Sequence, residues 1–370
     1  MGSFVRRRLK QITAIILTTL LYNEFLVYYM VLSQCSWPTS PYETTDEVRA
    51  MFIADTHLLG PTGHWWDRLR REWQMQRAFQ TSLQLHNPEI VFILGDLFDD
   101  GKWSSDAAFK EDVRRFHKMF HHSESVRLVS IIGNHDIGFH YMISPHRRER
   151  FVNAVNSSDS VRLLRHKDII FVTVNSMAFE GDDCNMCSQA RRDLSLISTE
   201  LTCAKNSWKD DVCRKYKKQN SYVQPILLQH FPMYRESDSA CTGPDSTPDD
   251  IKRVPFREGF DCLSKLASQQ LTDAVNPRLI ISGHTHFFCM HHRENGVEEW
   301  SVPSFSWRNI KNPSFLMASL TKDSHSINKC FMPDENTVYT VYITVIGSLL
   351  TYIFITILRH KMHGRRRKAS

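Results

Sequence analysis

The sequence MFIADTHLLG at residues 51–60 places an aspartate and a histidine directly after a short apolar run, and this arrangement decides the fold. The same arrangement recurs in four further segments: VFILGDLFDDG at 91–101, LVSIIGNHD at 128–136, PILLQHFP at 225–232 and LIISGHTH at 279–286. Each apolar run has the length of a buried strand and ends in carboxylate, amide or imidazole side chains. Because ligands bind outside the carboxyl ends of strands in α/β sheets, the five segments predict one shared polar site.

Strand-like and helix-like patterns alternate through the body of the chain. Strands are predicted at 50–53, 90–94, 126–132, 169–174, 225–229 and 279–282. Amphipathic helices are predicted between them, for example at 68–85, 107–120 and 258–269. This alternation is typical of an α/β domain. The last β patterns, at 286–292 and 299–302, follow without an intervening helix, so the sheet is predicted to be mixed. Residues 236–250 are predicted to form a long surface loop.

The residue types at the strand ends indicate metal chemistry. Oxygen and nitrogen ligands without sulfur suit a divalent ion such as Mn²⁺, Fe²⁺ or Zn²⁺. Two such ions about 3.5–4 Å apart activate water and hold both oxygens of an in-line phosphoryl displacement. A shared carboxylate is needed to keep two cations so close. Gly95, Gly133 and Gly283 lie beside the candidate ligands, where they permit sharp turns and close backbone approach.

The motifs DTH, GDLFD, GNHD, QH and GHTH, in this order, resemble those of the calcineurin-like metallophosphoesterase superfamily. The resemblance covers nearly the whole body and implies a four-layer αββα sandwich with mixed sheets. Carried over by position, it implies two metal sites that share Asp96. One site comprises Asp55, His57 and His286; the other comprises Asn134, His230 and His284.

The same resemblance implies that His135 is the general acid toward the leaving alkoxide and that Asp99 orients it. Asp100 stands where protein-phosphatase members carry an arginine, which argues against the Ser/Thr protein phosphatase branch. Trp65 and Trp66 follow the first motif. With Trp73 they are predicted to belong to a helix packed on the sheet, and the alternative is that Trp65 or Trp66 lines a substrate mouth or a membrane interface.

Longer segments resemble a membrane-bound branch of the superfamily that remodels GPI anchors: RAMFIADTHLLG, the helix GHWWDRLRREWQMQRAFQ, ILGDLFDDGKWS and GNHDIGFHY. This implies removal of the ethanolamine phosphate from the second mannose of the GPI glycan, with Mn²⁺ as the metal and GPI-anchored proteins as substrates. The residues themselves leave open a lumenal phosphodiesterase or pyrophosphatase for a nucleotide or another phospholipid. A catalytically dead GPI-binding cargo receptor is disfavoured, because every metal position and His135 are present.

Two apolar segments flank the body. Residues 338–358 read VYTVYITVIGSLLTYIFITIL, long enough to cross a bilayer, and the basic run 359–370 marks a cytosolic end. Residues 12–32 form the second candidate, behind a basic tail at 1–11, although Asn23 and Glu24 are costly in lipid. The alternative is a cleaved signal peptide with an apolar run at 12–21 and a cleavage site near Ser33 and Cys35. In either case residues 45–319 are predicted to be lumenal, with 320–337 as a tether.

The net charge of +6 comes from the tails. Ten of the 46 basic residues lie in the two terminal basic runs, which leaves 36 basic against 40 acidic residues elsewhere. The body is therefore mildly acidic, and no nucleic-acid partner is predicted. The resemblance to the GPI-remodelling branch implies an early secretory location, from endoplasmic reticulum exit sites to the cis-Golgi. The C-terminal RRRKAS approximates a dilysine-type retrieval signal, which predicts coat or cargo machinery as a partner. The alternative is a simple positive-inside cluster.

Eight of the nine cysteines lie between the apolar segments, and Cys35 borders the first. In an oxidising lumen this even set predicts disulfides among the eight, with the pairing undefined. No second CxxC accompanies Cys184 and Cys187, which favours a disulfide over a zinc or thiol redox site. Asn156 begins a glycosylation sequon on a predicted polar loop.

Overall fold

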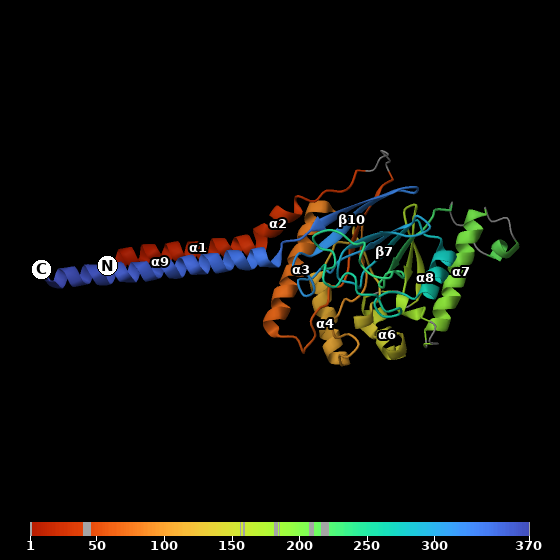
Figure 1. Ribbon diagram of the computed structural model, residues 1–370, viewed down its shortest axis with the longest axis horizontal. Helices are drawn as coiled ribbons and strands as arrows, with labels where there is room; N and C mark the ends of the chain where they lie inside the picture. Colours follow the sequence, from red (N-terminus) through yellow and green to blue (C-terminus); the bar gives the residue numbers. More distant parts are fainter. Residues whose placement is uncertain are drawn as a thin grey trace.

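Two mixed sheets form the centre of the body (Figure 1). The computed structural model describes residues 2–39, 46–155, 157, 160–180, 184, 186–206, 211–215 and 222–369, so the sequon residue Asn156 lies outside the described residues. The first sheet has the strand order β11-β10-β1-β2-β3 and the second the order β4-β5-β6-β7-β9-β8. The strands are β1 (Val48–Ile53), β2 (Ile90–Ile93), β3 (Arg127–Ser130), β4 (Val161–His166), β5 (Ile169–Val174), β6 (Ile226–Gln229), β7 (Leu279–Ser282), β8 (Cys289–His292), β9 (Glu298–Ser301), β10 (Ser314–Leu320) and β11 (His325–Phe331).

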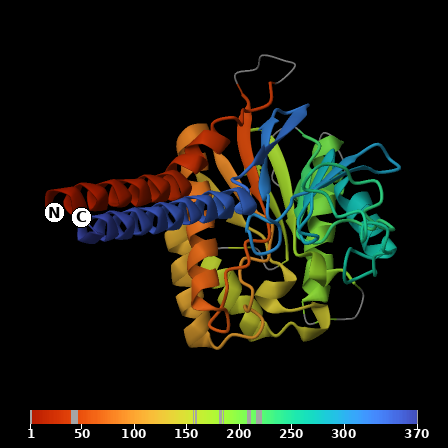
Figure 2. The same ribbon diagram turned by 60° about the vertical axis from the view of Figure 1, so that its left-hand side comes forward.

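Helices cover the outer faces of both sheets, as Figures 1 and 2 show. The first sheet carries α3 (Trp65–His86) and α4 (Asp106–Met119), and the second carries α7 (Cys187–Lys205) and α8 (Lys265–Val275). The short α5 (Asn134–Ile137) and α6 (Pro145–Val155) follow β3, and single 3₁₀ turns lie at His140–Met142, Ser176–Ala178 and Asp211–Lys215. The predicted αββα sandwich with mixed sheets is confirmed.

Alternating side chains explain why the two sheets pack face to face. Phe52 of β1 and Phe92 of β2 point inward and stack with ring centroids 5.3 Å apart. Phe92 reaches across to Phe171 of β5, in the other sheet, at 4.8 Å. Met51 and Ile53 alternate with Phe52 and belong instead to the core beneath the helices. Strands buried on both faces in this way read as continuous apolar runs, which is why the sequence locates them well.

The segment predicted as a tether, residues 320–337, does not fit that description. It contains β11, which pairs antiparallel with β10, and α9 already begins at Glu335. β11 is half-exposed and polar, as an edge strand often is, so it lacks the apolar pattern that reveals a buried strand. The body therefore extends past residue 319 to the base of the C-terminal helix.

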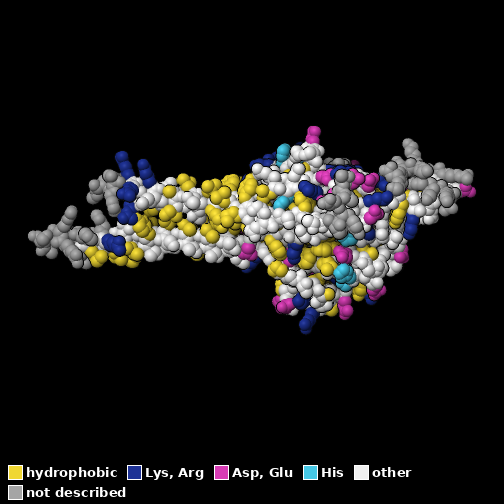
Figure 3. All heavy atoms as spheres, turned by 90° about the horizontal axis from the view of Figure 1, so that it is seen from above, with side chains coloured by type: hydrophobic (Ala, Val, Ile, Leu, Met, Phe, Trp, Pro, Cys, Tyr) yellow, Lys and Arg dark blue, Asp and Glu magenta, His cyan; other side chains and the backbone are white. Residues whose placement is uncertain are grey.

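Two long apolar helical segments leave the body on the same side and run side by side (Figure 1). One comprises α1 (Gly2–Leu21), a π-helical turn at Tyr22–Leu26 and α2 (Val27–Leu32); the other is α9 (Glu335–Ala369). Residues 6–32 and 335–359 are long and apolar enough to cross a membrane. Figure 3 shows hydrophobic side chains along both helices, with Lys and Arg near their far ends.

Asn23 and Glu24, which appeared costly for a lipid-facing segment, lie where the helices meet the body. The Asn23 side chain donates to the Val338 carbonyl at 3.2 Å. Glu24 accepts a hydrogen bond from Tyr342 and lies 3.7 Å from Arg70 of α3. The Asn23 amide nitrogen and the Glu24 carboxylate thus have partners in α9 or α3, which offsets part of their cost in an apolar segment.

Four disulfides fasten the body. The pairs are Cys35–Cys330, Cys184–Cys187, Cys203–Cys213 and Cys241–Cys289, and Cys262 is free and buried. The predicted disulfide at the CxxC is confirmed. The set of eight cysteines predicted to form disulfides is wrong at two positions. Cys262, which was in that set, is free, and Cys35, which was not, is bonded. The Cys35–Cys330 bond joins the end of the first apolar segment to β11.

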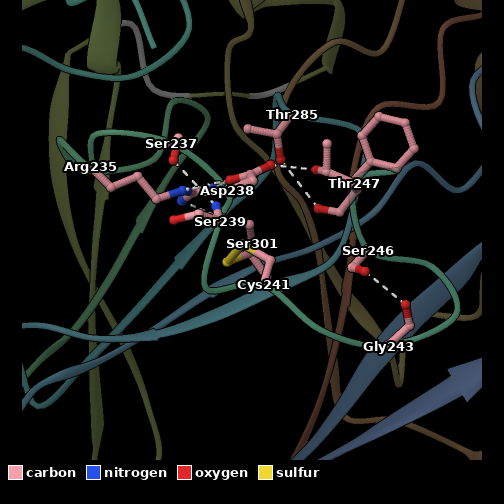
Figure 4. The surroundings of a disulfide bond; sticks show 12 residues. Arg235, Ser237, Asp238, Ser239, Cys241, Gly243, Ser246, Thr247, Thr285 and Ser301 are labelled. Carbon is pink, nitrogen blue, oxygen red and sulfur yellow. Dashed lines mark hydrogen bonds and ion pairs between the residues drawn. A yellow bond between two sulfur atoms is a disulfide. The ribbon is translucent and has the colours of Figure 1, made fainter. Parts of the chain in front are cut away.

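The Cys241–Cys289 bond fastens the predicted loop 236–250 to β8, just after the GHTH motif. Figure 4 shows Asp238 of this loop beside Arg235 and Thr247, and Arg235 Nε donates to Asp238 at 2.8 Å. Arg235 also donates to Ser301 at 3.1 Å, on β9. The loop is thereby fixed against the second sheet close to two candidate ligands, His284 and His286.

Candidate metal centre

The seven predicted ligands meet where β1, β2, β6 and β7 end, together with the start of α5. Potential ligand atoms of Asp55, His57, Asp96 and His286 form one group, within 4.8 Å of one another. Those of Asp96, His230 and His284 form a second, by the same measure. Asn134 Oδ1 joins the second group, 3.1 Å from His230 Nε2. Asp96 alone belongs to both groups, as its predicted bridging role requires.

The backbone at these ligands is unusual. Five of the seven have positive φ: Asp55 (53°), His57 (42°), Asp96 (50°), His284 (76°) and His286 (64°). Non-glycine residues rarely adopt this conformation, which costs of order 1–3 kcal/mol each and persists mainly at functional sites. The chain therefore turns sharply after β1, β2 and β7, where the candidate ligand atoms come together.

Two of the predicted glycines allow the ligand loops to touch. A Cβ on Gly133 would lie 2.2 Å from the backbone nitrogen of Asp96. A Cβ on Gly95, which has a φ of +92°, would lie 2.5 Å from the ring of His230. Any side chain at these two positions would push the bridging aspartate or His230 out of place.

In three of the candidate histidines, one ring nitrogen bonds a group outside the two groups of candidate ligand atoms. His57 Nδ1 pairs with Asp99 Oδ1 at 3.2 Å, and His230 Nδ1 with the Leu94 carbonyl at 2.7 Å. His284 uses Nε2 for the Phe260 carbonyl at 2.8 Å. Such outer hydrogen bonds fix the tautomer of metal-binding histidines. The remaining nitrogens of these three rings face the two groups of ligand atoms.

Two buried atoms of the site have no hydrogen-bond partner among the described residues: Asp55 Oδ1 and His284 Nδ1. Burial raises the pKa of Asp55 to about 8, with Asp96 adding to the effect and His230 opposing it. Burial lowers the pKa of His284 to about 3, with His230 adding to the effect. A divalent cation would pair with both atoms and stabilise the ionised carboxylate, so these residues fit a pair of metal ions.

His135 lies beside the candidate ligands on the accessible side of the site. About 32% of its side chain is accessible, as for His286, against 2% for His57 and none for His230. Its backbone nitrogen donates to Asp96 Oδ1 at 2.7 Å, which fixes its place next to the bridging residue. The ring is therefore held at the mouth of the site, as a proton donor to substrate should be.

The predicted role of Asp99 needs a correction in detail. His135 Nδ1 donates to the backbone carbonyl of Asp99 at 2.9 Å, and the Asp99 carboxylate lies 3.7 Å away. That carboxylate bonds His57 instead, and its other oxygen lies 2.8 Å from Arg308. Burial opposes the ionisation of Asp99, yet His57 and Arg308 outweigh it and lower the pKa. Asp99 thus orients His135 through its main chain and the ligand His57 through its side chain.

Two residues that support the site were not predicted. Arg308 follows β9 in a loop without a recognisable motif, and no pattern in the sequence marks it. Asp136, the last residue of GNHD, accepts hydrogen bonds from the backbone nitrogens of Gly133 at 2.8 Å and Phe98 at 3.0 Å. It joins the second and third ligand loops, and its place in the motif is the signal that could have revealed it.

Asp100, Trp65 and Trp66 lie outside the groups of candidate ligand atoms. Asp100 accepts a hydrogen bond from Thr62 at 2.7 Å, so it holds the loop after the first motif. The predicted helix is α3, which packs on the first sheet through residues such as Met75 and Phe79. Trp65 and Trp66 at its start are 62% and 51% exposed. Trp66 lines a cavity together with residues of the apolar helices.

The fold and this donor set define a metal-dependent phosphoesterase, and sequence comparison agrees. The calcineurin-like phosphoesterase family model matches residues 48–288, and the chain belongs to that family. Within it the chain is similar to proteins named Metallophosphoesterase 1. It is 48% identical to that of Mus musculus, over 95% of this chain and 89% of the relative, and 46% identical to that of Xenopus laevis, over 95% and 91%. A solved dimetal phosphatase from Danio rerio aligns with a TM-score of 0.46 at 13% identity, covering 76% of this chain and 95% of that one, a likeness too remote to bear on function.

Proposed function

We propose that the chain hydrolyses the phosphodiester that links ethanolamine phosphate to the second mannose of GPI anchors, with Mn²⁺ as the metal. One observation carries the proposal: a phosphoesterase site lies in a body whose two ends continue into adjacent apolar helices. Anchoring both ends to a bilayer would hold the site near the membrane and raise the effective concentration of a lipid-linked substrate. A GPI glycan projects from the lumenal leaflet and carries such a diester.

The residues suggest how such a diester is cleaved. When bound, a pair of divalent ions supplies Lewis-acid chemistry, polarising phosphoryl oxygens and making water a nucleophile at neutral pH. In this proposal the diester would lie beside the two groups of candidate ligand atoms, in front of His135. His135 holds its Nδ1 on the Asp99 carbonyl, which leaves Nε2 to donate a proton to the departing mannose oxygen. The products are a free sugar hydroxyl and ethanolamine phosphate.

Oxygen and imidazole ligands without sulfur support manganese but also suit iron and zinc. We further propose that the enzyme acts on GPI-anchored proteins in the early secretory pathway and that its basic C-terminal tail engages coat or cargo machinery. The proposed orientation has both termini cytosolic and the body lumenal. The basic ends of both apolar helices support it. The contacts of Asn23 and Glu24 with α9 and α3 support a first segment that is retained and not cleaved.

The proposed orientation predicts a protease-protection pattern. In sealed microsomes, added protease should spare the body and remove a C-terminal tag, since only the two terminal tails are on the outside. A body digested without detergent would contradict the orientation. An N-terminal tag that is still present on the mature protein would show that the first segment is a membrane helix, and its loss would show cleavage.

The proposed substrate predicts a change in GPI glycans. Cells without the protein should keep the ethanolamine phosphate on the second mannose, detectable by mass spectrometry, and should export GPI-anchored proteins slowly. Ordinary transmembrane cargo should leave at its normal rate. Re-expression of the Asp96→Asn variant should not restore the glycan, which separates catalysis from a binding role.

Two outcomes would contradict this assignment. Glycans that lack the phosphate in deficient cells would mean that another enzyme removes it, and they would favour a nucleotide or other phospholipid as the substrate. An equal delay for all cargo would indicate a general defect in export.

A further inference from the structure

A cavity of about 440 Å³ lies where the apolar helices join the body. Three parts of the chain line it: Leu20 and Glu24 of the first apolar segment, Trp66, Leu69, Arg70 and Trp73 of α3, and Tyr339 and Tyr342 of α9. Its walls are almost entirely apolar. Trp66, Leu69, Leu20 and Tyr339 are each 40% or more exposed, so their apolar surface is open to whatever surrounds the helices.

The one basic residue of this lining, Arg70, is buried with part of its guanidinium group unused. Only 9% of the residue is accessible. The rings of Trp307 and Tyr339 face the guanidinium at 4.7 and 5.0 Å, and Glu24 reaches its Nη1 at 3.7 Å. Its Nε and Nη2 have no hydrogen-bond partner among the described residues. Buried charged donors are normally satisfied, so this edge indicates a missing acceptor.

A second unused donor lies in the same wall. The indole Nε1 of Trp73 is buried and has no hydrogen-bond partner among the described residues. Buried indole nitrogens usually find an acceptor. An occupant of the cavity should therefore present an apolar body to the rings and an anionic oxygen to Arg70 and Trp73.

We propose that this cavity binds a glycerophospholipid of the surrounding bilayer. Its acyl chain would lie against Leu20, Leu69 and Trp66, and its phosphodiester would accept hydrogen bonds from the guanidinium after a small shift of the buried Arg70 side chain. The position supports this occupant, because Tyr and Trp gather where a membrane helix meets the headgroups. Arginine also suits phosphate better than a point charge does, since its donors are held in a fixed planar fork. The inference does not depend on which phosphodiester the metal centre cleaves.

Photolabelling of the full chain in phosphatidylcholine nanodiscs tests the proposal. Two probes carry the same diazirine acyl chain: one is phosphatidylcholine, and the other is diacylglycerol, which lacks the phosphate. We expect the phosphatidylcholine probe to label peptides covering 65–73 and 335–342 about tenfold more, as one charge-assisted hydrogen bond would give. Equal labelling by both probes, or labelling confined to residues 343–358, would overturn the proposal.

Two matched variants complete the test. Leu69→Glu places an anion beside Arg70 at a position that is 56% exposed, so the fold should survive, and phosphatidylcholine labelling should fall to the diacylglycerol level. Leu85→Glu makes the same change on α3, at a position that is 39% exposed and outside the cavity, and should label like the wild type. Arg70→Met should act like Leu69→Glu if it folds. Equal labelling of Leu69→Glu and Leu85→Glu would show that the cavity holds no phosphate.

Discussion

Replacing Asp96 with asparagine is expected to reduce phosphoesterase activity by about 10³-fold or more. Asp96 is the one ligand common to both groups, with Oδ2 lying 3.6 Å from His57 Nε2 and 3.3 Å from His230 Nε2. An amide cannot supply the negative charge that holds two cations close together. Lewis-acid stabilisation by bound metal is worth several kcal/mol, and each 1.36 kcal/mol is a tenfold change in rate.

The Asp96→Asn protein should still fold. The two side chains have nearly the same shape, and asparagine keeps an oxygen to accept from the His135 backbone nitrogen. Circular dichroism and the melting temperature of the metal-free protein measure this. Asp112→Asn is the matched control, because Asp112 is another buried aspartate, on α4 and outside the centre. It should keep its metal and its activity. An Asp96→Asn protein that retains near-normal turnover would show that the shared carboxylate is dispensable.

His135→Ala is expected to lower kcat by about 10²–10⁴-fold while the metals stay bound, the range typical of general acid–base catalysis. His135 lies outside the two groups that share Asp96, although its ring forms a further cluster with His57 and Asp99. Its ring hydrogen bond goes to a backbone carbonyl, so its removal leaves the ligand His57 still held by Asp99. In this variant turnover should therefore fall while the metal content stays at the wild-type level.

The leaving group provides a sharper test of the same residue. An alkoxide needs a proton as it departs, whereas p-nitrophenolate departs readily without one. The His135→Ala defect should be large for an alkyl phosphodiester and much smaller for a p-nitrophenyl phosphodiester. His146→Ala, a change to an exposed histidine paired with Asp106, is the control and should match the wild type on both. Loss of metal from His135→Ala, or equal defects on both substrates, would rule out the acid role.

The candidate ligand set was predictable because fold and chemistry leave the same mark in the sequence. The segments combine a largely apolar strand, such as β2, with a polar side chain at or just after its end. The apolar run is needed because these strands are covered on both faces. The polar residue follows because the site is formed by the turns at the strand ends. Both signals are local, so neither required knowledge of the tertiary structure.

Features that depend on distant contacts were not predictable. β11 is an edge strand with a polar pattern, so only its pairing with β10 reveals it. The partner of Cys35 lies at Cys330, 295 residues away, and no spacing rule connects them. Arg308 contacts Asp99 from a loop that contains no motif, so nothing in the sequence distinguishes it from other arginines. The side-chain role of Asp99 depended on the same tertiary contact.

The metal content of the purified full-length protein tests the central claim most directly. Inductively coupled plasma mass spectrometry of the wild type should find two divalent ions per chain, and removing them with a chelator should abolish activity until metal is restored. Asp96→Asn should contain fewer than two ions, and His135→Ala the full complement. An active wild-type enzyme without bound metal, or an Asp96→Asn protein that retains both ions, would contradict the account of a metal centre bridged by Asp96.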